Sequence, residues 1–121
     1  MNRGSNLVHY QKRNDTLTPF RADLWQADGT PLPTLNGVFW FFVRNERGVL
    51  VIQRPGTAET GTYDGRVTTR FQFQWLPGET ALPPGDYLAE IEVQYGSPDQ
   101  RLTIPTDDYF TIRVIEDLNP L

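Results

Sequence analysis

The feature of this sequence that most constrains its fold is a repeated alternation of apolar and polar residues with a period of two. The clearest run covers residues 87–95, where tyrosine, alanine, isoleucine and valine alternate mainly with glutamate and glutamine. A second run covers residues 67–75. Successive side chains of a β-strand point to opposite faces, so this pattern predicts strands with one buried and one wet face. Shorter alternating runs cover residues 20–24 and 110–114, and other candidate strands cover residues 7–12, 38–44, 49–53 and 101–104.

Turn-forming sequences separate these runs. The chain has 10 glycines and 10 prolines among 121 residues, and many lie between the alternating segments. Such residues supply the positive or preset φ angles that tight turns need. The pairs that mark turns most clearly are Asp28-Gly29, Asn36-Gly37, Asp64-Gly65 and Pro77-Gly78. Turns at intervals of about 8–12 residues predict an all-β chain of seven or eight antiparallel strands, arranged as a sandwich or a barrel.

One tyrosine favours an immunoglobulin-like β-sandwich over a barrel. Tyr87 follows the Gly85-Asp86 turn at the start of the clearest strand. Immunoglobulin-like folds often place a tyrosine there, with its hydroxyl bonded back to the preceding corner. The alternative is a strand that simply begins with a tyrosine.

Composition excludes several functional classes. The net charge is −4, from 11 basic and 15 acidic residues, so no basic field attracts nucleic acid or an anionic membrane. The absence of cysteine excludes disulfides, thiolate catalysis and zinc–thiolate sites. The longest apolar run, residues 38–43, is far too short to cross a bilayer. The polar first residues lack the apolar segment of a signal peptide, so we expect synthesis in a cytoplasm.

Five motifs follow one another in a characteristic order. They are Asp15-Thr16, Asp28-Gly29-Thr30-Pro31, Trp75-x-Pro77-Gly78-Glu79-Thr80, Gly85-Asp86-Tyr87-x-x-Glu90 and Pro105-Thr106-Asp107-Asp108-Tyr109. This order resembles the immunoglobulin-like N-terminal domain of phage upper-baseplate and related tail proteins. The similarity extends over most of the chain, residues 15–114.

The resemblance implies a non-enzymatic structural protein of the virion, made in the host cytoplasm. A tail, baseplate or neck component would assemble in multiple symmetric copies and contact other virion structural proteins. A decoration protein of the head surface is an alternative. We expect residues 1–14 to form an N-terminal arm or first strand, residues 15–115 the sandwich and residues 116–121 a C-terminal tail.

The segment GVFWFFVR does not alternate and has an apolar residue on both faces. One face carries Val38, Trp40 and Phe42, and the other carries Phe39, Phe41 and Val43. The resembling family usually has polar residues at the first set, which places the second set in the core. The first set would then form an exposed apolar patch that binds a partner. Two alternatives are a strand covered on both faces by the protein's own loops, and a Trp40 that fills the core.

Other apolar residues are candidates for the same partner contact. Trp25 lies beside the expected core residue Leu24 and would extend the patch. Leu118 and Leu121 are apolar residues in the C-terminal tail. Terminal arms that become ordered on assembly are common in proteins that build rings, and frayed ends are the alternative.

The sequence contains little that could support catalysis or bind a cofactor. The single histidine, His9, has no Gly-x-Ser-x-Gly motif downstream. Glu90 and Glu92 point the same way along one strand, as in a solvated face. We therefore expect neither an enzyme nor a cofactor.

Two binding alternatives remain open at the level of the sequence. Calcium is the best metal candidate, with Asp86, Asp107 and Asp108 as oxygen ligands, although the same residues suit an ordinary Asx-rich turn. A carbohydrate-binding module for host adhesion is the second functional hypothesis. In that case Trp25, Trp40 or Trp75 would stack on sugar rings.

Overall fold

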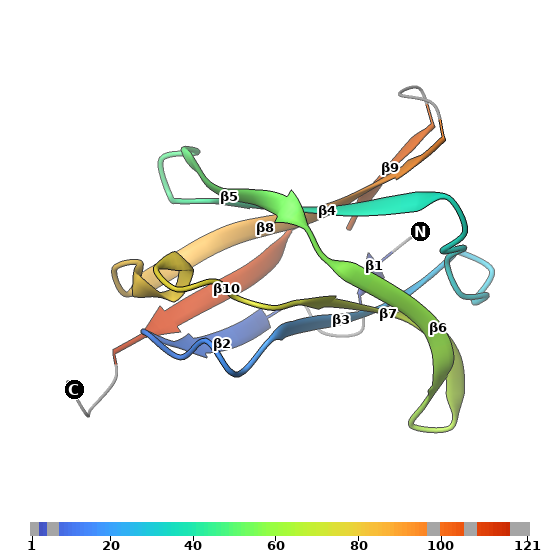
Figure 1. Ribbon diagram of the computed structural model, residues 1–121, viewed down its shortest axis with the longest axis horizontal. Helices are drawn as coiled ribbons and strands as arrows, with labels where there is room; N and C mark the ends of the chain where they lie inside the picture. Colours follow the sequence, from blue (N-terminus) through green and yellow to red (C-terminus); the bar gives the residue numbers. More distant parts are fainter. Residues whose placement is uncertain (1–2, 5–7, 97–99, 106–108, 117–121) are drawn as a thin grey trace.

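The computed structural model describes residues 3–4, 8–96, 100–105 and 109–116 (Figure 1). This part of the chain is mainly β-strand, with one short 3-10 helix, η1 (Glu79–Ala81), and no α-helix. The strands are β1 (Arg3–Gly4), β2 (Val8–Lys12), β3 (Phe20–Trp25), β4 (Gly37–Arg44), β5 (Leu50–Pro55), β6 (Thr57–Tyr63), β7 (Arg66–Phe73), β8 (Gly85–Tyr95), β9 (Arg101–Ile104) and β10 (Phe110–Ile115). The prediction of an all-β chain is confirmed.

The strands form two sheets. One has the order β1-β3-β7-β6, and the other has the order β2-β10-β8-β4-β5, with β9 also paired to β8. β9 and β10 lie one after the other along the same edge of β8. In Figure 1 the β6–β7 hairpin and the β8–β9 hairpin extend from the body of the domain in different directions.

One pairing differs from the sequence prediction of antiparallel strands throughout. β2 runs parallel to β10, with Ile112 opposite His9. A parallel pair needs no hairpin between its members, so no turn sequence marks it. The pairing also shows that part of residues 1–14 forms a strand of the larger sheet.

The core lies between the two sheets and is rich in aromatic rings. The ring of Phe41, on β4, lies with its centroid 4.5 Å from that of Phe73 and 4.8 Å from that of Phe20, both in the other sheet. Each fully buried phenylalanine contributes roughly 1.5–3 kcal/mol to folding relative to an exposed one. The inward positions of β4 are Phe39, Phe41 and Val43, as the family resemblance led us to expect.

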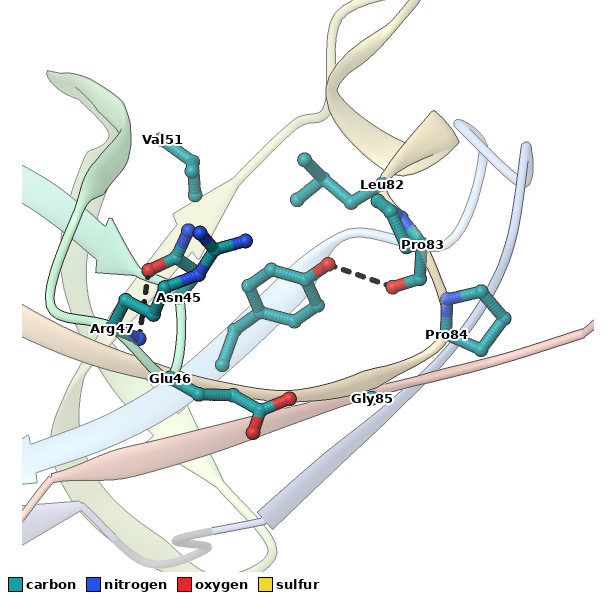
Figure 2. Close-up of a pocket in the computed structure, with 9 residues that line it drawn as sticks. Asn45, Glu46, Arg47, Val51, Leu82, Pro83, Pro84 and Gly85 are labelled. Carbon is teal, nitrogen blue, oxygen red and sulfur yellow. Dashed lines mark hydrogen bonds between the residues drawn. The ribbon is translucent and has the colours of Figure 1, made fainter.

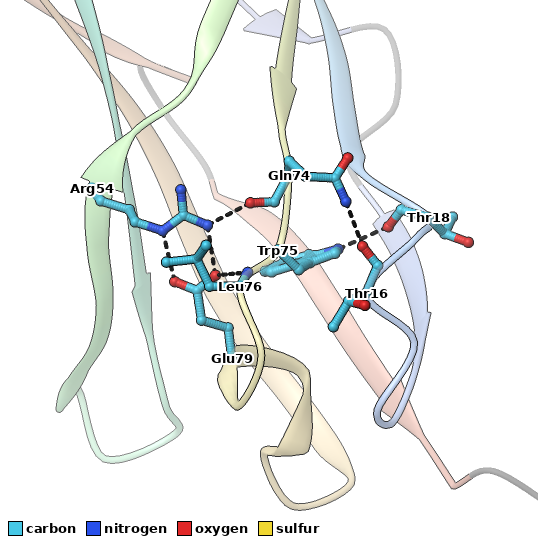
Figure 3. Close-up of polar contacts among 7 residues, drawn as sticks. All are labelled: Thr16, Thr18, Arg54, Gln74, Trp75, Leu76 and Glu79. Carbon is cyan, nitrogen blue, oxygen red and sulfur yellow. Dashed lines mark hydrogen bonds and ion pairs between the residues drawn. The ribbon is translucent and has the colours of Figure 1, made fainter.

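Two aromatic side chains close one end of the core with hydrogen bonds to the backbone. The hydroxyl of Tyr87 donates to the carbonyl of Pro83 at 2.7 Å (Figure 2), so the expected bond back to the preceding corner is confirmed. The indole N–H of Trp75 donates to the carbonyl of Thr18 at 2.8 Å (Figure 3). Trp75 is buried, so the hypothesis that it stacks on a sugar is wrong.

The chain crosses from the larger sheet to the smaller one at Gly56, between β5 and β6. Its N–H donates to the carbonyl of Phe39 at 2.9 Å. A Cβ at this position would lie 2.5 Å from the ring of Phe71, so only glycine fits without a shift. The close packing of Gly56 therefore sets how near the two sheets come at this corner.

Candidate partner-binding face

The outward side of β4 carries the apolar set that the sequence singled out. The side chain of Val38 is 45% exposed, whereas Trp40 and Phe42 are half-buried. In the strand register Trp40 lies between Pro55 of β5 and Glu92 of β8, on the face away from the core. The alternative in which Trp40 fills the core is therefore wrong, because Phe39 and Phe41 already occupy the inward positions of this strand.

Further apolar side chains join this set on the outer side of the larger sheet. Trp40 and Phe42 stack at a centroid distance of 6.5 Å. Leu88 is 40% exposed and Tyr109 is 47% exposed, and both line one hollow together with Phe42. We call these residues the outer-face patch: Val38, Trp40, Phe42, Leu88 and Tyr109. The exposure of Val38 argues against a strand that the protein's own loops cover completely.

Leu88 and Tyr109 were not among the candidate contacts inferred from the sequence. Leu88 does leave a local signal, because it is an apolar residue at a polar position of the alternating segment 87–95. Tyr109 leaves none, since its place beside β4 depends on how β9 and β10 follow the edge of β8.

A row of carboxylates on β8 lies beside the patch. The strand register places Glu90 opposite Phe42 and Glu92 opposite Trp40. Arg101 forms an ion pair with Glu92 at 3.3 Å, and Arg113 forms one with Asp86 at 2.8 Å. Among the residues that the structure describes, the side chain of Glu90 forms neither a hydrogen bond nor an ion pair.

The electrostatic environment of Glu90 reflects this lack of a partner. Burial is the main cause that raises the pKa of the Glu90 carboxyl above its ordinary value. The charge of Arg44 opposes the shift, and the neighbouring charge of Glu92 adds to it. The face therefore contains one partly desolvated carboxylate among paired ones.

Two hollows flank the turn between β4 and β5. Asn45 holds this turn, because its side-chain oxygen accepts the N–H groups of Arg47 and Val49 at 3.0 Å each. The smaller hollow, about 210 Å³, opens on the outer face, and we call it the outer hollow. Its lining is Phe42, Arg44, Asn45, Glu46, Gly48, Leu88, Glu90 and Tyr109.

The larger hollow, about 340 Å³, lies on the other side of the turn (Figure 2). Its lining includes Tyr87. Figure 2 shows Pro83 and Pro84 on the side across from Asn45 and Arg47. The hydroxyl of Tyr87 is already bonded to Pro83, so this polar group is not free for a ligand.

Trp25 does not extend the outer-face patch, and this expectation is wrong. It lies on β3, in the smaller sheet, and the guanidinium of Arg66 lies 4.4 Å from its ring centroid. On the same sheet Arg70 covers the ring of Tyr63 at 3.9 Å. Trp25 alternates with the core residue Leu24 and so points outward, but from the opposite side of the molecule.

The other candidate residues divide between described and undescribed parts of the chain. The carboxylate of Asp86 is hydrogen-bonded to Arg113, which lowers its pKa. Asp107, Asp108, Leu118 and Leu121 lie outside the described residues. Among the residues that the structure does describe, no group of three or more histidine, aspartate or glutamate side chains is placed to hold a metal ion.

His9 packs as a structural residue. One ring nitrogen lies 2.9 Å from the side-chain oxygen of Gln11, and the ring meets Phe20 edge-on at 5.4 Å.

In the described part of the chain, no helix has the length and apolar character needed to span a membrane. No protein-family model matches this sequence. The curated proteins contain no match to it either.

Proposed function

We propose that this chain is a non-enzymatic structural protein of a phage virion, a tail, baseplate or neck component that assembles in several symmetric copies. The observation that carries the proposal is the outer-face patch, a contiguous apolar surface centred on the Trp40–Phe42 stack. Large exposed apolar patches on soluble domains mark interaction sites, and buried aromatic residues dominate the energy of such contacts.

The arrangement of strands supports an immunoglobulin-like sandwich, the fold that the phage resemblance implies. Such domains place their strands A, B, E and D in one sheet and C, F and G in the other. The orders β1-β3-β7-β6 and β10-β8-β4-β5 follow this scheme when strands are assigned in chain order. The bond from Tyr87 to Pro83 has the form of a tyrosine corner.

The charge on the outer face supports contact between copies of the same chain. The whole chain carries a net charge of −4, which would oppose association. On the outer face of β4, β8, β9 and β10, however, three arginines match three carboxylates. These are Arg44, Arg101 and Arg113 with Asp86, Glu90 and Glu92. A second copy therefore meets a locally neutral surface.

The test is the mass of the protein in solution, measured by sedimentation velocity over a range of concentrations. We expect the wild type to form a discrete multimer. We expect Trp40→Ser to weaken association by at least about tenfold, because it removes an aromatic anchor worth roughly 2 kcal/mol or more. Thermal unfolding should show that the monomer remains folded.

Trp25→Ser is the matched control, since it removes an outward tryptophan from the opposite sheet. This variant should associate like the wild type. A wild type that stays monomeric at every concentration would contradict the proposal, as would a larger effect of Trp25→Ser. Antibody labelling of particles in the electron microscope then distinguishes a tail, baseplate or neck position from decoration of the head surface.

A carbohydrate-binding role is the second candidate, favoured by the stacked Trp40 and Phe42 beside carboxylates. Aromatic rings of this kind provide apolar faces on which sugar rings can pack. A glycan array probed with the wild type and Trp40→Ala tests it. Binding that the variant loses supports this role, and the absence of binding above background excludes it.

A further inference from the structure

We propose that the outer hollow is a receptor for an arginine side chain of a neighbouring protein subunit. This inference rests on the proposed function and names the chemistry that the contact surface recognises. It is carried by the combination of a hollow, an unpaired carboxylate and aromatic walls at one place on the outer face.

The carboxylate is the first element. Glu90 points out of β8 into the outer hollow and lies opposite Phe42 in the strand register. Glu92 and Asp86, the acidic residues on the same face of this strand, are each paired with an arginine of the protein itself. Among the described residues nothing neutralises Glu90 in this way. A partly buried carboxylate without a partner gains free energy when a cation binds beside it.

The remaining charges of the outer hollow also favour a cation. Its lining contains two carboxylates, Glu46 and Glu90, and one arginine, Arg44, which gives a local charge of −1. The guanidinium of Arg44 is held by the carbonyl of Gly48 at 3.0 Å and not by Glu90. The charge of Arg44 acts on the Glu90 carboxylate from a distance, but no hydrogen bond or ion pair joins the two side chains.

The walls select arginine among cations. Phe42 and Tyr109 contribute aromatic rings, and Leu88 contributes an aliphatic surface. The planar guanidinium group stacks on aromatic faces and donates two parallel hydrogen bonds to one carboxylate. Arginine already lies over the rings of Phe73, Trp25 and Tyr63 elsewhere in this protein. The volume of about 210 Å³ accommodates one such side chain and is too small for a folded element.

The test uses N-acetyl-L-arginine amide as the probe and N-acetyl-L-citrulline amide as its neutral isostere. Sedimentation velocity first establishes whether the full chain is a multimer. If it is, the arginine probe should compete with the neighbouring subunit and lower the observed mass. If it is a monomer, the probe should shift the backbone amide NMR signals of Phe42, Leu88 and Glu90. In both cases the citrulline probe should have no comparable effect.

Glu90→Gln should weaken the response to the arginine probe by about tenfold, because it removes the charge-assisted hydrogen bonds. Glu59→Gln is the matched control, because Glu59 is an exposed glutamate on β6 of the other sheet, and it should respond like the wild type. An equal response to both probes overturns the inference, as does an unchanged response of Glu90→Gln. A stronger response to methyl β-D-glucopyranoside also overturns it and supports the sugar-binding role.

The outcomes separate this inference from the proposed function. A monomer that binds the arginine probe through Glu90 contradicts assembly from identical copies but supports the arginine receptor. A multimer that Trp40→Ser dissociates, and that neither Glu90→Gln nor the arginine probe affects, supports the proposed function and overturns the receptor.

Discussion

Glu90 shows how a single residue on a regular strand acquires a special environment. Its position in the alternation makes it one of three outward carboxylates on β8. Arg101 and Arg113 come from β9 and β10, and each meets a different carboxylate, so Glu90 remains beside the ring of Phe42. Removing a charge from water without a partner costs free energy, and the raised pKa of Glu90 expresses that cost.

The pH dependence of stability should report this cost. The folded protein holds the pKa of Glu90 above its unfolded value, so ionisation of Glu90 disfavours folding. The penalty is absent below the ordinary glutamate pKa of about 4.3 and complete above the folded value. Glu90→Gln should therefore raise the free energy of unfolding at pH 7, with a gain that disappears in acid.

Urea unfolding of both proteins at pH 7 and pH 3 measures this difference. Arg44, Glu46 and Glu92 are the charged groups that surround Glu90, and they are the same in both proteins. Glu92→Gln serves as the contrast, because it loses the ion pair with Arg101 and should not gain stability at pH 7. A Glu90→Gln variant that is less stable than the wild type at pH 7 would contradict the assignment.

At the scale of elements, the connection between β5 and β6 places a strict steric requirement on one residue, Gly56. The chain leaves one sheet at Pro55 and enters the other at Thr57, with Gly56 between them. The missing side chain of Gly56 lets the backbone pass close to the ring of Phe71 and the carbonyl of Gln72. A single residue thus makes the change of sheet without a loop.

Gly56→Ala should destabilise the protein by about 1–3 kcal/mol, because the added methyl group overlaps a packed ring and a backbone oxygen. Chemical denaturation measures the loss. Gly48→Ala is a control of a different kind: its φ of +79° is strained for alanine, but its added methyl group would meet nothing within 4 Å.

A double-mutant cycle with Phe71→Leu separates the two causes. The smaller side chain should relieve part of the cost of Gly56→Ala and none of the cost of Gly48→Ala. If Phe71→Leu adds to Gly56→Ala without coupling, the ring is not the source of the penalty.

At the scale of the whole molecule, a cluster of polar side chains joins the two sheets in addition to the shared core (Figure 3). Arg54, on β5 of the larger sheet, donates to both carboxylate oxygens of Glu79 at 2.9 and 2.6 Å. It also donates to the carbonyl of Gln74, just after β7 of the smaller sheet. Glu79 in turn accepts the N–H of Leu76 at 2.6 Å. The cluster connects segments that no backbone hydrogen-bond ladder joins.

Glu79→Ala should lower the free energy of unfolding by about 1–3 kcal/mol, because three hydrogen bonds to a partly buried charge are lost. Equilibrium urea unfolding measures the change. Asp86→Ala is the control, since its ion pair with Arg113 is exposed and joins two strands of the same sheet. This control should lose much less stability, and equal losses would show that the cluster does not tie the sheets together.

Local patterns were sufficient for much of the fold. The alternation at residues 67–75 and 87–95 predicted strands and most of their inward positions, because side-chain direction depends only on the extended backbone. The start of the first run is an exception, since Val67 is exposed and Thr68 is buried. The corner bond of Tyr87 could also be predicted, since Pro83 lies four residues away in the chain. The parallel pairing of β2 with β10 could not, because it joins distant segments and needs no local turn.

The candidate site divides in the same way. The double-sided apolar character of β4 identified Val38, Trp40 and Phe42 as outward residues once Phe39 and Phe41 were assigned to the core. The sequence did not reveal that Leu88, Tyr109 and Glu90 would join them, nor that Trp25 would lie on the other sheet. Those facts depend on which strands become neighbours.

The sequence by itself determined the all-β class, the faces of the main strands and the surplus of apolar residues on β4. Only the tertiary structure decided that this surplus gathers around a hollow with an unpaired carboxylate, while Trp25 is covered by Arg66 on the opposite side. The physical reason is that a period of two assigns each side chain to one of two faces. Which side chains from other strands lie beside it on that face depends on how the whole core is buried between the two sheets.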